Sequence, residues 1–70
     1  MRGHIRRVMG GCAFVAAKEL PNDGFLTRRE FHRARRKPES EAKFKAGTWL
    51  EFRIRPDHPR PRVVEVEVLE

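Results

Sequence analysis

The side chains best suited to chemistry in this chain of 70 residues are aromatic rings and guanidinium groups. Phe14 lies in the apolar run GGCAFVAA, residues 10–17, and Phe25 lies in GFLT, residues 24–27. A flat ring can stack on a nucleobase, and an arginine guanidinium can both stack on a base and pair with a phosphate. Together these groups could bind a polyanion that carries flat bases.

Positive charge exceeds negative charge, with 16 Lys+Arg against 10 Asp+Glu and a formal net charge of +6. On so small a body this places a positive potential over much of the surface, which suits polyanionic partners. The segment RREFHRARRK, residues 28–37, holds six Arg or Lys and one Glu. The charge predicts a phosphate-bearing partner, while the arginine-rich segment itself is equally compatible with a plain solvated surface.

The other reactive groups are too few for catalysis or metal binding. The three histidines, His4, His32 and His58, belong to different predicted elements, and Cys12 is the only cysteine. A disulfide framework and a cysteine-based metal site are therefore excluded, and a lone thiol suits a reducing cytoplasm. Neither a phosphate loop nor a nucleophile elbow is present. We expect a cytoplasmic monomer that is not an enzyme, with no metal, cofactor, small-molecule substrate, targeting segment or membrane association.

The elements that would position these side chains are mostly strands. Alternating or β-branched runs predict five of them, at residues 3–9, 12–17, 24–27, 48–55 and 62–69. Gly10 and Gly11 predict a two-residue hairpin turn between the first two, because both can adopt positive φ. Thr27 lies three residues before Glu30, the spacing of a capping box, which predicts a helix over residues 28–36.

Three strands, a short helix and two strands follow the element order of the oligonucleotide/oligosaccharide-binding (OB) barrel. We therefore predict an all-β fold: a five-stranded antiparallel OB-type barrel with a short helix between strands 3 and 4. Seventy residues leave room for one domain, residues 1–70. An SH3-like barrel is the structural alternative.

The direction in which Phe14 and Phe25 point depends on strand parity. If Val15 points inward, alternation places the small Ala13 and Ala17 beside it, as the interior of a narrow barrel favours. Phe14 then points outward, and the same parity turns Phe25 outward. The reverse parity stays open, because phenylalanine is usually buried. The predicted core also includes Ile5, Leu26, Phe31, Phe44, Leu50, Phe52, Ile54, Val64, Val66 and Val68.

A family resemblance runs through nearly the whole chain. Its segments are GHIRRV at residues 3–8, GCAFV at 11–15, DGFLTR at 23–28, FKAGTWLEF at 44–52 and RPRVVEV at 60–66. In that order they are similar to five motifs of the bacterial cold-shock domain. Those motifs are Gly-x-Val-x-x-Phe, Gly-Phe-Gly-Phe-Ile, Asp-Val-Phe-Val-His-Phe, Leu-x-x-Gly-x-x-Val-x-Phe and Gly-Pro-x-Ala-x-x-Val. That family is an OB barrel that binds single-stranded RNA and DNA.

The resemblance implies a stacking surface on the second and third strands. Phe14 and Phe25 stand where the family has stacking phenylalanines, whereas Cys12 replaces another one. Thr27 stands in place of a histidine. By this resemblance, the chain retains two of the family's stacking aromatic residues.

Arginines stand at several of the remaining positions. Arg28 replaces a family phenylalanine, and Arg6 and Arg7 replace a first-strand lysine and tryptophan. Fewer rings should weaken base-dependent binding, so that more of the affinity is Coulombic and sensitive to salt.

We therefore predict a single-stranded RNA- or DNA-binding protein of the cold-shock type, acting as an RNA chaperone or expression regulator. The predicted nucleic-acid-binding residues are Arg6, Arg7, Phe14, Phe25, Thr27, Arg28, Arg29, Arg33, His58 and Arg60. The alternative is a small basic adaptor, OB- or SH3-like, that binds an acidic protein surface and no nucleic acid.

Overall fold

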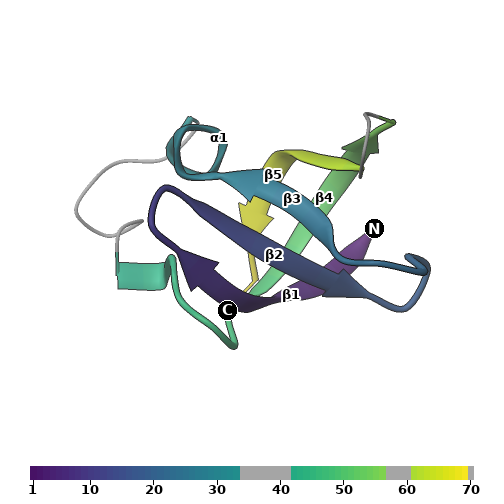
Figure 1. Ribbon diagram of the computed structural model, residues 1–70, viewed down its shortest axis with the longest axis horizontal. Coiled ribbons are helices and arrows are strands. Elements are labelled where there is room, and N and C mark those ends of the chain that lie inside the picture. Colours follow the sequence, from purple (N-terminus) through teal and green to yellow (C-terminus); the bar gives the residue numbers. More distant parts are fainter. Residues whose placement is uncertain (34–41, 57–60, 70) are drawn as a thin grey trace.

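The computed structural model describes residues 1–33, 42–56 and 61–69. Its strands are β1 (Arg2–Met9), β2 (Cys12–Ala17), β3 (Gly24–Thr27), β4 (Trp49–Arg55) and β5 (Arg62–Val68), and a short helix, α1 (Arg28–His32), follows β3 (Figure 1). All five predicted strands are confirmed to within one residue at each end. The helix begins where it was predicted, and residues 34–36 of that prediction lie outside the described residues.

Local turn chemistry accounts for the first hairpin. Met9 pairs with Cys12, so Gly10 and Gly11 form a two-residue turn, and Gly10 has the left-handed φ of 60° that such a turn requires. Thr27 caps α1 as expected, because its Oγ1 accepts a hydrogen bond of 3.1 Å from the backbone N–H of Glu30.

The second half of the predicted capping box is not formed. Instead of reaching back to Thr27, the Glu30 carboxylate accepts a hydrogen bond of 3.1 Å from the backbone N–H of Glu65 in β5. Glu65 has a φ of 52°, unusual for a residue with a side chain, and its N–H points out of the regular ladder towards α1. Glu30 therefore ties the helix to an irregularity in β5.

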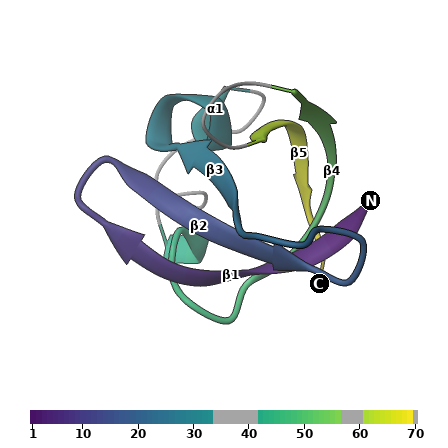
Figure 2. The ribbon, with the colours of Figure 1, turned by 45° about the vertical axis from the view of Figure 1, so that its right-hand side comes forward.

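The strands pair in the order β1-β2-β3-β5-β4, and β4 pairs with β1, so the sheet closes into a ring (Figure 2). Neighbours are antiparallel except β3 and β5, which pair in parallel at Phe25 and Arg62. The predicted antiparallel pairing therefore holds for four of the five strand pairs, and β3/β5 is the exception. A closed ring with an odd number of strands cannot alternate direction throughout, so one pair must be parallel.

The interior of the ring holds most of the predicted core. Its buried apolar residues are Ile5, Ala13, Val15, Leu26, Phe31, Phe44, Leu50, Phe52, Val63 and Val66. Ala17, Ile54 and Val68 are only partly buried, and Val64 is buried outside this cluster. Leu20 and Val8 pack against the edge of the cluster.

Val63 is a core residue that strand alternation missed. We expected Val64, Val66 and Val68 to share one face, yet Val63 is fully buried. The register between β4 and β5 shifts between Glu51 and Arg53, where Glu65 takes its positive φ. A bulge of this kind adds one residue to a strand, so the inward parity before it is opposite to the parity after it.

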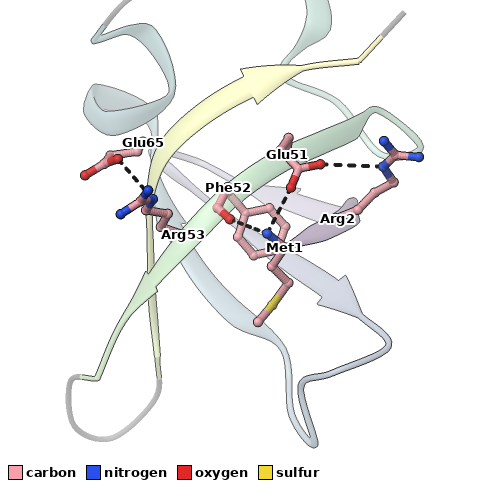
Figure 3. Close-up of polar contacts among 6 residues, drawn as sticks. All are labelled: Met1, Arg2, Glu51, Phe52, Arg53 and Glu65. Atoms are coloured by element: carbon pink, nitrogen blue, oxygen red, sulfur yellow. Dashed lines mark hydrogen bonds and ion pairs between the residues drawn. The ribbon is translucent and has the colours of Figure 1, made fainter.

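The start of the chain is anchored on β4 (Figure 3). The Met1 ammonium donates to the Glu51 carboxylate at 3.0 Å and to the Phe52 carbonyl at 2.8 Å, and Arg2 lies 3.6 Å from the same carboxylate. The hydrogen bond from the ammonium, assisted by the charge of Arg2, holds the pKa of the Glu51 carboxyl below its ordinary value of 4.5 against the opposing effect of desolvation.

We expect this contact to make the stability of the protein sensitive to acid. Because the pKa of Glu51 is lower in the folded state, the unfolded state binds its proton more readily. The stabilisation is therefore present above about pH 4.5 and is lost as the pH falls through the folded-state pKa. Thermal unfolding between neutral pH and about pH 3 should show a smaller acid-induced fall in Tm for Glu51→Gln than for the wild type. Glu19→Gln removes the same charge from an exposed position and should retain the wild-type fall; equal falls in all three proteins would contradict the prediction.

Candidate nucleic-acid interface

A bulge in β1 brings two arginines to the outer face of the sheet. Ile5 lies opposite Val15, and Arg7 lies opposite Phe14, so Arg6 is an extra residue in β1. Regular alternation would turn only one of the two arginines outward, but both side chains are exposed. The bulge thus places two guanidinium groups beside one phenylalanine.

Phe14 and Phe25 lie directly opposite each other on β2 and β3. Their ring centroids are 6.1 Å apart at an interplanar angle of 64°, and both side chains are partly exposed. Their chain neighbours Val15 and Leu26 are fully buried, so the predicted parity is confirmed and the reverse parity is excluded. The two rings form a short aromatic strip on the outside of the ring of strands.

A hollow of about 650 Å³ opens beside this strip, and we call it the first hollow. It is lined by Arg6, Arg7, Phe14, Pro21, Asn22, Asp23 and Pro61. The Arg7 guanidinium carbon lies 5.6 Å from the centroid of the Phe14 ring, within cation–π distance. The Asp23 carboxylate fixes the Arg6 guanidinium at 3.0 Å on the rim. The first hollow therefore combines a flat aromatic wall with two guanidinium groups, of which Arg6 is paired with Asp23.

The remaining predicted binding residues do not gather at the first hollow. The Thr27 hydroxyl is occupied in capping α1, and Arg28 donates to the Gly10 carbonyl at 3.1 Å. The Arg28 guanidinium also lies over the Phe44 ring, 4.5 Å from its centroid. Arg29 and Arg33 are exposed on and just after the helix, and Arg33 lies 3.4 Å from a Glu30 carboxylate oxygen. The last two predicted residues, His58 and Arg60, lie outside the described residues.

Sequence reasoning missed the residues that border the first hollow on the loop side, Pro21, Asn22, Asp23 and Pro61. The first three belong to the run KELPNDG, residues 18–24, whose composition predicts a turn and nothing more. The ion pair between Arg6 and Asp23 could not be predicted from the sequence, because Asp23 follows Arg6 by 17 residues and contacts it only in the folded chain. The Pro61 carbonyl accepts from the Phe25 N–H at 2.8 Å, which brings the start of β5 to the same place.

The arrangement offers binding chemistry: flat rings, guanidinium groups and an open hollow. Among the described residues, no three His, Cys, Asp or Glu side chains gather closely enough to hold a metal ion. No described helix has the length and apolar character needed to cross a membrane. Comparison with protein-family models, curated proteins and solved structures gives no match. Any function must therefore be argued from the residues and geometry of this surface.

Proposed function

We propose that this protein binds single-stranded RNA or DNA on the outer face of β1, β2 and β3. Bases would stack on Phe14 and Phe25, and phosphates would pair with Arg6 and Arg7. The single observation that carries the proposal is the adjacent, partly exposed pair of phenylalanines beside a hollow lined by two exposed arginines. The net charge of +6 supports a polyanionic ligand.

The arrangement of the strands supports an OB-type barrel of the cold-shock kind as the finer description of the fold. Five strands that close into a ring, with a helix between β3 and β4, match the element order of the OB barrel. OB folds bind oligonucleotides on the face formed by strands 2 and 3. Phe14 and Phe25 lie on that face, which agrees with the proposed site.

The balance of rings and cations suggests low sequence selectivity. Each base–aromatic stack contributes about 1–3 kcal/mol and tolerates every base, because all bases have a π-face. Contacts of Arg6 and Arg7 with phosphates also carry no sequence information by themselves. We therefore expect many sequences to bind with similar affinity, as an RNA chaperone or a general expression regulator would require.

Salt dependence tests the proposal. Affinity for a pyrimidine-rich single strand should fall linearly in a double-logarithmic plot between about 50 and 200 mM salt, with a slope of about 0.7 for each phosphate contacted. Arg7→Gln should lower that slope by about 0.7, because it removes one contact beside Phe14.

Arg53→Gln is the matched control, since it removes one exposed charge from β4 that does not line the first hollow. The control should retain the wild-type slope. Equal slopes in both variants would show that the positive charge acts through the general field and not at the first hollow. Failure of the wild type to bind any oligonucleotide would overturn the proposed function.

A further inference from the structure

A second hollow, of about 390 Å³, lies on the outer face where β1 passes between β2 and β4. Trp49, the only tryptophan of the chain, forms one wall and is 51% exposed. Its neighbour Leu50 is fully buried, so the alternation of β4 directs the indole outward. The site proposed at the first hollow gives no role to this large exposed ring.

The indole is held against a second ring. His4 lies directly opposite Trp49 in the β1/β4 pair, and their ring centroids are 4.9 Å apart at an interplanar angle of 45°. Beside them the hollow is lined by the small residues Gly3, Ala16 and Ala17. A Cβ on Gly3 would lie 2.3 Å from the Ala16 carbonyl oxygen, so only glycine allows β1 and β2 to approach this closely. The result is an aromatic wall beside a low apolar floor.

This second hollow lies on the same face of the sheet as the aromatic strip. His4 lies opposite Ala16, and Ala16 lies on the same face of β2 as Phe14, two residues away. Phe14 in turn lies opposite Phe25. The path from Trp49 to Phe25 therefore crosses three strand spacings and one two-residue step, a length of about 20 Å along the face.

We infer, on the basis of the proposed function, that Trp49 and His4 form a second base-stacking subsite for the end of the single strand whose other bases contact Phe14 and Phe25. Arg2 and Lys18 line the second hollow together with Glu19. Arg2 lies 3.6 Å from the Glu51 carboxylate, so Lys18 supplies the positive charge for a phosphate. With a net charge of +6 on each chain, a second copy of the protein is electrostatically disfavoured as the occupant. A flexible polyanion with stackable bases matches both the rings and the charge.

Oligonucleotide length distinguishes the two subsites. A heptathymidylate can reach from the strip to Trp49, whereas a trithymidylate bound at Phe14 and Phe25 cannot cover both. Trp49→Ala should therefore weaken binding of the heptamer by about 5-fold or more, the equivalent of one lost stack, and change binding of the trimer by less than about 2-fold. Trp49→Phe should restore most of the heptamer affinity. Met9→Ala removes an equally exposed apolar side chain that lines neither hollow, and it should bind like the wild type.

Indole fluorescence gives an independent measurement, since all tryptophan emission comes from Trp49. The heptamer should quench this emission with the same midpoint as binding measured by filter retention or anisotropy. Heptamer binding without quenching, together with wild-type affinity in Trp49→Ala, would overturn the inference while leaving the proposed function intact. An emission shift that depends on protein concentration alone would also overturn it, because a second copy would then cover the indole. Absence of any oligonucleotide binding would instead refute the proposed function.

Discussion

Replacing both Phe14 and Phe25 by alanine should lower the affinity for single-stranded oligonucleotides by about 30-fold or more. Each base–aromatic stack contributes about 1–3 kcal/mol, so losing two of them costs about 2 kcal/mol at the least. The fold-loss should be similar at low and high salt, because the double variant retains Arg6 and Arg7 and therefore the salt-dependent phosphate contacts. Anisotropy titrations with a labelled pyrimidine-rich strand at two salt concentrations measure this loss.

A conservative variant separates stacking from folding. Phe14→Tyr combined with Phe25→Tyr retains both rings and should keep most of the affinity. Both side chains are partly exposed, so the alanine variant should lose much less stability than a core truncation does. If the folded alanine variant binds with wild-type affinity, the bases do not stack on this strip.

Leu26→Ala should mainly lower the stability of the protein, unlike the phenylalanine variants, which should mainly lower its affinity for oligonucleotides. Leu26 is fully buried in the core, and truncation of such a residue costs about 2–5 kcal/mol through lost burial and the cavity that remains. A domain of this size has a total stability of only about 4–10 kcal/mol, so the variant should be close to unfolding. Urea denaturation followed by circular dichroism measures the change in the free energy of unfolding.

The neighbouring substitution Phe25→Ala is its matched control, because the two residues are adjacent on β3 but face opposite sides. Phe25→Ala should weaken oligonucleotide binding at nearly unchanged stability, whereas Leu26→Ala should destabilise the fold. Similar stability losses in both variants would contradict the assignment of Phe25 to a binding face.

Much of the local structure could be predicted from the sequence because it depends on neighbouring residues. Gly10 supplies the positive φ of the first turn, and Thr27 supplies the oxygen that caps the helix. Alternation along β2 and β3 separates Val15 and Leu26 from the two phenylalanines. Period-two burial is a property of a single strand, so alternation left only two parities for Phe14, and the small Ala13 and Ala17 favoured the one that the structure has.

The candidate binding surface was decided by the tertiary structure. The bulge that turns both Arg6 and Arg7 outward depends on how β1 pairs with β2, and the bulge at Glu65 that buries Val63 depends on how β5 pairs with β4. Neither bulge can be recognised from the hydrophobic periodicity of the strand that contains it.

The contacts between distant residues were also beyond sequence reasoning. Asp23 orients Arg6 across 17 residues, and His4 meets Trp49 only because β4 closes the ring against β1. Within the regular strands β2 and β3, the sequence by itself indicated which side chains face outward, since alternation is local. Only the closed ring decided which outward side chains lie together, because strand pairing and register join residues that are far apart in the chain.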